Sequence, residues 1–196
     1  MASETGVTIL RSANHRRMPW KNGGGETMEI AVHPTNSGLE DFGWRVSMAR
    51  VESDGHFSLF PGIDRTLALL EGDGMALAID GAAERLVTPA TEPLTFPADR
   101  PTEARLVGGP ILDLNVMTRR GLWDHSVTHL SLAGPHLLTP RAELTLLLAL
   151  APIEIDAHGK LDRLDAALLS TPVHVAAEQP ASVYLIALTP SARRGR

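Results

Sequence analysis

The sequence of 196 residues contains no cysteine. This absence excludes disulfide bonds, thiolate zinc sites and cysteine nucleophiles, and it suits a reducing cytoplasm. Residues 1–17 contain no apolar segment of signal-peptide length, and the longest apolar run, residues 144–150, is too short to span a bilayer. We therefore expect a cytoplasmic protein that has no membrane partner.

The chain also lacks an excess of positive charge, since its formal net charge is −5 at pH 7. Proteins that bind nucleic acid usually carry a basic patch or stripe. A basic cluster is present in residues 193–196, but a disordered tail is the ordinary explanation at that position. We expect no nucleic-acid partner.

Glycine and proline are frequent, with 17 and 14 residues spread along the chain. Short apolar runs lie between them, a pattern typical of many short strands. The sequence therefore predicts an all-β protein. Residues 160–169 are ambiguous, because their leucines have helical spacing whereas the repeat described next would place a turn and a strand there. The candidate strands are residues 27–32, 44–51, 65–71, 74–80, 92–96, 104–107, 112–117, 123–130, 143–150, 153–156, 173–176 and 182–188.

Two parts of the sequence resemble each other. Residues 94–101 (LTFPADRP) align with residues 173–180 (VHVAAEQP), an offset of 79, and nearly the same offset relates residues 78–81 to 157–159. Chance similarity between short β segments is one explanation, and a duplicated strand-turn unit is the other. A repeat of this length suits one half of a two-barrel chain, with a boundary within residues 118–142.

Residues 18–30 (MPWKNGGGETMEI) contain three consecutive glycines, Gly23, Gly24 and Gly25. Such a run loses much backbone entropy on folding and packs no side chain, so it indicates a tight turn or a close approach of the backbone to another group. No GK[ST] follows, and the run is not framed as a strand, GxGxxG and a helix, which argues against a nucleotide-binding loop. The turn is either a polar connection before a strand or a turn that also lines a site.

A polar and mostly cationic group lies on or beside the predicted strands and consists of Lys21, Arg45, Arg65 and Asn115. In residues 44–49, Arg45, Ser47 and Ala49 share one face of the strand, so this face is expected to line a pocket while the other packs in the core. A buried arginine needs a partner, and its guanidinium suits a carboxylate. That partner is either an anionic ligand or, in a structural ion-pair network, one of the protein carboxylates Asp54, Asp64, Asp99 and Asp113.

Four motifs carry a resemblance to a known family: residues 18–30, 42–49 (FGWRVSMA), 54–65 (DGHFSLFPGIDR) and 109–120 (GPILDLNVMTRR). In this order they resemble the HutD/Ves family, and length and pattern extend the resemblance over nearly the whole chain. It implies a cupin-like fold of RmlC-type double-stranded β-helix barrels, with two packed degenerate halves (a bicupin). Residues 1–120 would form the N-terminal half and residues 121–196 the degenerate C-terminal half, packed as one unit.

The resemblance also implies an association with histidine utilisation in many bacteria and with stress response in others, without a defined reaction. Our leading hypothesis is a protein that binds a small anionic metabolite, a carboxylate of the formylglutamate, formiminoglutamate or urocanate type, and modulates histidine utilisation. The alternatives are a metal-independent hydrolase or isomerase, which would use Lys21 with Glu26 or Asp113, and a stress-induced protein with a vestigial pocket. Whether the protein is an enzyme stays open at this point.

The candidate ligand-binding residues combine the glycine turn with the cationic group and its neighbours on the strands. Because cupin relatives commonly dimerise through strand edges, which must be covered or charged, we also expect a homodimer. The predicted site residues are Lys21, Asn22, Gly24, Glu26, Arg45, Ser47, Arg65, Asp113 and Asn115.

We predict that the purified protein carries no stoichiometric transition metal and no other cofactor. Metal-binding cupins use an H-x-H pair with further ligands, and the corresponding stretch here, residues 55–62, contains only His56. His125 and His129 share one face of an extended strand, but two partly exposed histidines are the ordinary explanation. Chelator is therefore expected to leave the melting temperature unchanged. Elemental analysis that finds about one zinc, iron or manganese per chain would contradict this prediction.

Overall fold

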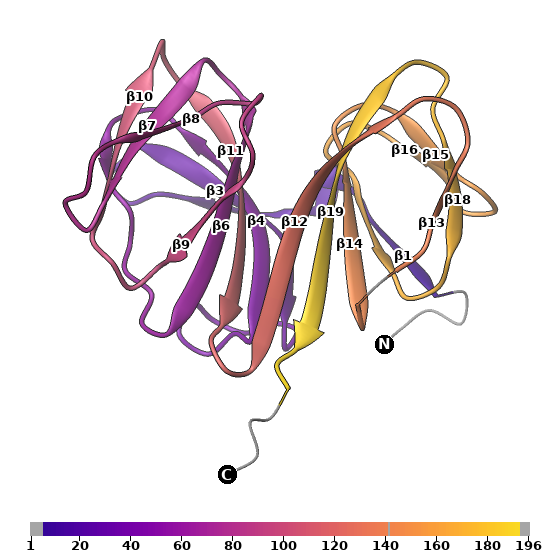
Figure 1. Ribbon diagram of the computed structural model, residues 1–196, viewed down its shortest axis with the longest axis horizontal. Helices are drawn as coiled ribbons and strands as arrows, with labels where there is room; N and C mark the ends of the chain where they lie inside the picture. Colours follow the sequence, from indigo (N-terminus) through magenta and orange to yellow (C-terminus); the bar gives the residue numbers. More distant parts are fainter. Residues whose placement is uncertain (1–5, 141, 193–196) are drawn as a thin grey trace. The chain divides into compact units, whose positions relative to one another are not determined.

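The computed structural model describes residues 6–140 and 142–192, in which the regular elements are strands apart from one 3₁₀ helix, η1 (Ser12–Asn14) (Figure 1). Each strand predicted from the sequence overlaps an observed strand. In the same residues no helix is long and apolar enough to cross a bilayer. The basic tail, residues 193–196, lies outside the described residues.

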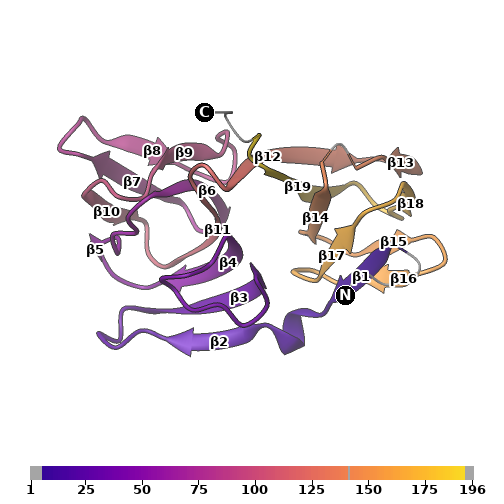
Figure 2. The same ribbon diagram turned by 90° about the horizontal axis from the view of Figure 1, so that it is seen from below.

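The described chain divides into two compact units. The first unit comprises residues 16–124 with 191 and 192, and the second comprises residues 6–15 with 125–190. The boundary between residues 124 and 125 lies within the expected range, but residues 6–15 do not belong to the expected N-terminal half. The reason is that β1 (Val7–Leu10) pairs antiparallel with β17 (Ala166–Leu169) (Figure 2). In addition, Val7 packs into the apolar core of the second unit.

The first unit contains two sheets, with strand orders β2-β3-β4-β11-β6-β9 and β5-β10-β7-β8. Of the eight consecutive strands β4 to β11, the first, third, sixth and eighth lie in the larger sheet and the other four in the smaller. This is the division of a jelly-roll barrel, the architecture of cupins. The bounds are β2 (Arg16–Pro19), β3 (Gly25–His33), β4 (Trp44–Val51), β5 (Gly55–His56), β6 (Ile63–Glu71), β7 (Gly74–Ile79), β8 (Arg85–Val87), β9 (Leu94–Pro97), β10 (Thr102–Val107) and β11 (Ile111–Arg119).

The second unit has the same topology. Its sheets run β1-β17-β14-β19-β12 and β13-β18-β15-β16, so β12 to β19 repeat the places of β4 to β11 in order. The prediction of an all-β, cupin-like chain with two related halves is therefore confirmed. The remaining bounds are β12 (Trp123–Leu132), β13 (His136–Leu138), β14 (Leu144–Ala149), β15 (Ile153–Ile155), β16 (Gly159–Leu161), β18 (Val173–Ala176) and β19 (Ala181–Pro190).

The topology corrects the alignment of the repeat. The sequence analysis paired β9 with β18, whereas β9 takes the place in its sheet that β17 takes in the second unit, and the counterpart of β18 is β10. The turns after β7 and β15 remain equivalent, and both contain residues with positive φ, among them Asp80 and Ala157. The connections from β15 to β16 and from β16 to β17 are both shorter than their counterparts, β7 to β8 and β8 to β9, so a single offset of 79 cannot hold beyond β15.

The ambiguous residues 160–169 form no helix. They contain the end of β16, a turn and β17, so the helical alternative was wrong. Leu164 adopts a left-handed φ of 67°, which ends any helical path. The carboxylate of Asp165 closes the turn by accepting the Asp162 N–H at 3.1 Å and the Ser12 N–H at 2.7 Å.

The three glycines form a tight turn between β2 and β3. The Gly23 N–H donates to the Trp20 carbonyl at 3.0 Å, and the Trp20 N–H donates to the Gly25 carbonyl at 2.9 Å. Gly23 has a φ of +72°, a conformation that favours glycine. Gly25 has no room for a side chain, because a Cβ would collide with the Arg50 carbonyl oxygen and lie 3.1 Å from the Trp20 ring. The glycine run therefore combines a tight turn at Gly23 with a close approach of the backbone to β4 at Gly25.

We predict that Gly25→Val lowers the melting temperature far more than Gly23→Val. The first change drives a side chain into the backbone of β4, which cannot yield without breaking the β3–β4 pairing. At Gly23 the new side chain meets open space, so the cost is the left-handed backbone, on the order of 1–3 kcal/mol. Gly55→Ala is the control, because no atom lies within 4 Å of its Cβ and its φ is not left-handed. Wild-type stability of Gly25→Val would contradict the close approach.

Candidate functional site

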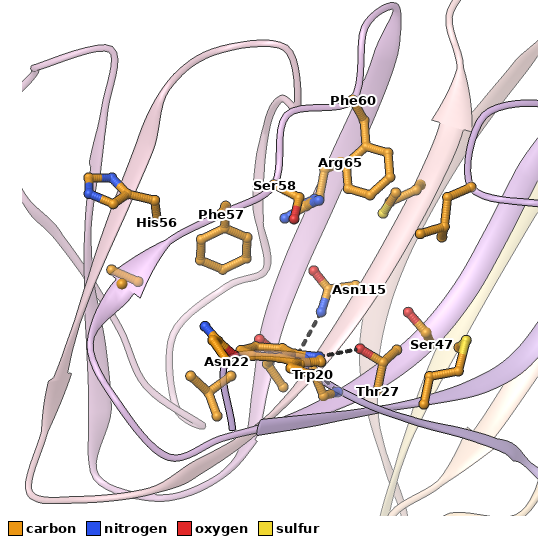
Figure 3. A pocket seen from close by; sticks show the side chains of 18 of the residues that line it. Trp20, Asn22, Thr27, Ser47, His56, Phe57, Ser58, Phe60, Arg65 and Asn115 are labelled. Atoms are coloured by element: carbon orange, nitrogen blue, oxygen red, sulfur yellow. Dashed lines mark hydrogen bonds between the residues drawn. The ribbon is translucent and has the colours of Figure 1, made fainter. Parts of the chain in front are cut away.

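The first unit contains a cavity of about 630 Å³. Its wall is formed by residues of β4, β6 and β11 in the larger sheet, by the end of β2 with the turn that follows it, and by residues 53–60. Figure 3 shows Arg65, Asn115, Phe57 and Phe60 among the side chains of this wall. The cavity is large enough for a small metabolite.

The alternation of side chains along the strands brings the polar residues to the cavity. Arg45, Ser47 and Ala49 of β4 all line it, as do Asp113, Asn115 and Met117 of β11, as period two requires. The strand registers align these rows: Met117 pairs with Arg45 on one side and with Arg65 of β6 on the other. Two arginines therefore flank one residue of the central strand β11.

Arg45 is neutralised by the protein itself. Its Nε donates to the Glu29 Oε2 at 2.7 Å, and the two side chains are only 6% and 11% exposed. The structural ion pair considered in the sequence analysis thus exists at Arg45, but its carboxylate comes from Glu29 of β3 and from none of the four aspartates named there. Removing one member of such a buried pair typically costs 3–5 kcal/mol, so we assign Arg45 first to stability.

Arg65 is buried in an aromatic setting. It is 4% exposed, and its guanidinium carbon lies 4.9 Å from the ring centroid of Phe57, 5.4 Å from Phe60 and 5.9 Å from Phe96. Among the described residues no carboxylate forms an ion pair with Arg65, and its Nε has no hydrogen-bond partner. Burial lowers the pKa of Arg65 to about 10, against the opposing charge of Asp113, so the group stays cationic at neutral pH.

Asp113 and Asn115 form a buried polar pair on β11, the strand next to that of Arg65. Asp113 Oδ1 accepts the Asn115 side-chain N–H at 2.6 Å and the Ala49 backbone N–H at 3.2 Å. Asp113 Oδ2 and Asn115 Oδ1 are also buried, and neither has a donor within the described chain. Burial raises the pKa of Asp113 to about 7, although the charge of Arg65 and both hydrogen bonds act in the opposite direction.

Seven of the nine predicted site residues line the cavity. Lys21 and Asn22 reach it from the glycine turn, in which Asn22 Oδ1 accepts the Gly24 N–H at 3.1 Å. Gly24 and Glu26 do not line it, and Glu26 instead pairs with Arg17 at 2.8 Å. Those that line it are Lys21, Asn22, Arg45, Ser47, Arg65, Asp113 and Asn115.

The sequence analysis missed the aromatic part of the wall, namely Trp20, Phe57 and Phe60. All three belong to the motifs quoted above, and the spacing of Phe57 and Phe60 before Arg65 was the available signal. Aromatic faces stabilise a nearby guanidinium, so an arginine close to two phenylalanines in a motif was the pattern to weigh. As for metals, no cluster of three ligating side chains is found in residues 6–140 and 142–192.

Stability is predicted to fall with rising pH because of Asp113. Its pKa is raised from 3.8 in the unfolded reference to about 7 in the folded chain. Between these values the folded state holds a proton that the unfolded state has lost, so the contribution is complete below pH ~4 and is lost as pH rises through about 7. One proton gives a slope of at most about 1.4 kcal/mol per pH unit.

Denaturant unfolding of wild type and Asp113→Asn between pH 4 and 8 measures this contribution as the difference between the two curves. The variant is expected to lack the downward slope. Asp156→Asn, the same change at an exposed position, is the control and should keep it. Parallel curves for wild type and Asp113→Asn would show that Asp113 titrates normally.

Known proteins match this chain over most of its length. The family model described as HutD matches residues 12–185. A 21.2 kDa protein of Pseudomonas putida, named for the hutC 3′ region, is 42% identical over 111 residues, which are 57% of this chain and 57% of that protein. The protein Ves of Cronobacter sakazakii is 40% identical over 109 residues, 54% of this chain and 58% of its own. The match thus spans somewhat more than half the length of these curated relatives.

Solved structures agree with the fold. A conserved protein of unknown function from Pseudomonas aeruginosa PAO1 has a TM-score of 0.84 and 33% identity, covering 93% of this chain and 98% of its own. HutD from Pseudomonas fluorescens SBW25 has a TM-score of 0.81 and 30% identity, covering 95% and 100%. A cupin 2 conserved barrel domain protein from Leptotrichia buccalis, at 12% identity and a TM-score of 0.60 over 92% and 100%, shares the fold alone. With the matched family model and these two 30–33% identical structures, the chain belongs to the HutD family.

Proposed function

We propose that the first unit binds a small carboxylate in its cavity and that the protein modulates histidine utilisation as a binding or sensing protein. The family is associated with the histidine-utilisation locus, and the P. putida relative is named for the hutC 3′ region. Intermediates of the formylglutamate or urocanate type are the proposed ligands. Both are small enough for a cavity of about 630 Å³.

The observation that carries the proposal is the buried Arg65, which forms no ion pair within the described residues. Burying a cation is costly unless an anion compensates it, and the aromatic rings around Arg65 supply only part of that compensation. Asp113 lies close enough to influence its pKa but forms no ion pair with it. A ligand carboxylate can supply the missing charge, and a guanidinium binds it through two parallel hydrogen bonds.

The neighbouring Arg45 does not compete for this role. Its charge is already balanced by Glu29, and it lies two strands away from Arg65, across Met117. Lys21 is exposed and also lines the cavity. Arg65 and Lys21 are therefore the cations that favour an anionic occupant, and low local dielectric makes the interaction with the buried Arg65 stronger than in water.

A metal-independent enzyme is the second candidate, because Asp113 combines a cavity position with a pKa of about 7. A buried carboxyl with such a pKa can act as a general acid or base at neutral pH. The first partner suggested for Lys21, Glu26, lies outside the cavity, which leaves Asp113 for this role. Consumption of a bound carboxylate during prolonged incubation would favour the enzyme, and binding without turnover the sensor.

The binding proposal is tested by calorimetry with formylglutamate and urocanate on wild type, Arg65→Met and Arg45→Met. We predict that Arg65→Met weakens carboxylate binding by about 2–5 kcal/mol while the free protein keeps or gains stability, because an uncompensated charge is removed. Arg45→Met should instead destabilise the free protein by about 3–5 kcal/mol, since it leaves Glu29 buried and unpaired.

Arg105→Met serves as the control, because Arg105 pairs with Glu84 at the surface of the same unit and lies away from the cavity wall. It should change neither quantity measurably. An unchanged affinity of Arg65→Met for both carboxylates, or no binding to wild type, would refute the anion site.

A further inference from the structure

The row of side chains that β11 and its neighbouring strands present to the cavity differs in charge between its two ends. Along β11, Met117 lies between the two arginines, Asn115 follows on the same face at about 7 Å and Asp113 at about 14 Å, since a strand advances about 3.4 Å per residue. One end of this row is therefore cationic. The other end presents an amide and a carboxyl group to the cavity.

The amide and carboxyl end contains two oxygen atoms that lack donors. Asp113 Oδ2 and Asn115 Oδ1 are buried, and the described residues offer neither of them a hydrogen bond. The two residues are 1% and 7% exposed, so solvent hardly reaches them. A buried acceptor without a donor is destabilising, by more than a typical hydrogen bond contributes to stability.

The same pair is held in place by donors on its other side. The Ala49 N–H and the Asn115 amide both donate to Asp113 Oδ1, which orients the carboxyl group and leaves Oδ2 available. Because the Asn115 amide nitrogen donates to Asp113, the orientation of the amide group is fixed, and its oxygen is the atom that remains available as an acceptor. Figure 3 shows this hydrogen bond as a dashed line that leaves the side chain of Asn115.

We infer that the ligand of this cavity carries an N–H or O–H donor in addition to its carboxylate, and that Asp113 and Asn115 select for that donor. The inference rests on the proposed function, because the carboxylate is assigned to Arg65. When Asp113 is ionised, a carboxylate whose other end offers only acceptors would be repelled by Asp113 and Asn115 and would leave both oxygens without a donor. A site built to receive a donor rejects analogues that lack it far more strongly than an apolar pocket rejects a missing methylene.

Two pairs of carboxylates that differ in one ring atom test the inference. Pyrrole-2-carboxylate and furan-2-carboxylate form the short pair, and indole-5-carboxylate and benzofuran-5-carboxylate form the long pair, so that two spacings between carboxylate and donor are sampled. In each pair an N–H donor is exchanged for an oxygen acceptor at constant shape. Calorimetry on wild type at about pH 8.5, where Asp113 is ionised, is expected to give at least about tenfold tighter binding of the N–H member in one pair.

Asp113→Asn provides the decisive variant. The amide oxygen keeps the hydrogen bonds from Ala49 and Asn115, and the amide nitrogen then occupies the place of Oδ2. An acceptor is thereby replaced by a donor, so the preference should invert and the furan or benzofuran member should bind tighter. Asn115→Leu, which removes the second free oxygen, should reduce the wild-type preference and keeps the test decisive if Asp113→Asn fails to fold. Asp156→Asn is the matched control at an exposed position and should keep the wild-type preference.

The outcomes separate this inference from the proposed function. Binding of both members of each pair with equal affinity, lost in Arg65→Met, would uphold the carboxylate site and overturn the donor selection. A preference for the N–H member that persists unchanged in Asp113→Asn and Asn115→Leu would overturn the assignment to these residues. Failure of all four carboxylates to bind a wild-type protein that binds formylglutamate or urocanate would overturn the donor selection alone, whereas failure of all these carboxylates to bind would overturn both proposals.

Discussion

The antiparallel pairing of β11 with β4 on one side and β6 on the other is the constraint on which the site depends. It fixes the register that sets Arg45, Met117 and Arg65 in one line across three strands. A shift by one residue would turn the whole row of polar side chains toward the opposite face, because successive side chains alternate. The paired strands β4, β11 and β6 therefore position the polar side chains of the cavity, whereas the surrounding loops supply aromatic residues.

Within this ladder the two buried arginines have opposite thermodynamic roles. Arg45 has a protein carboxylate at hydrogen-bond distance, so its burial is compensated in the free chain. Arg65 has aromatic faces instead, and its charge makes no ion pair in the described chain. Binding proteins commonly keep such a group because a ligand can supply what the fold omits, whereas a fully compensated pair has little left to offer. Under the proposed function, Arg45 contributes to stability and Arg65 to recognition of the ligand.

Much of the fold could be predicted because strands follow local rules: glycine and proline mark their ends, and the shared face of Arg45 and Ser47 follows from period two. The Arg45–Glu29 pair could not, since it depends on the β3–β4 register, which shifts between Glu29 and Ala31. The repeat was aligned wrongly because the two units differ in the lengths of their connections. The interaction between the charges of Asp113 and Arg65 likewise depends on the pairing of β11 with β6, which no spacing in the sequence encodes.

Because β1 pairs with β17, the strands of the second unit cannot all pair in the order in which they are synthesised. β1 is synthesised before its partner strand, Ala166–Leu169, and the strands of the first unit lie between the two in the sequence. The first unit takes no strand from residues 7–10, so its sheets can form while β1 is still unpaired. A nascent chain that stops before residue 166 therefore contains β1 without its partner strand.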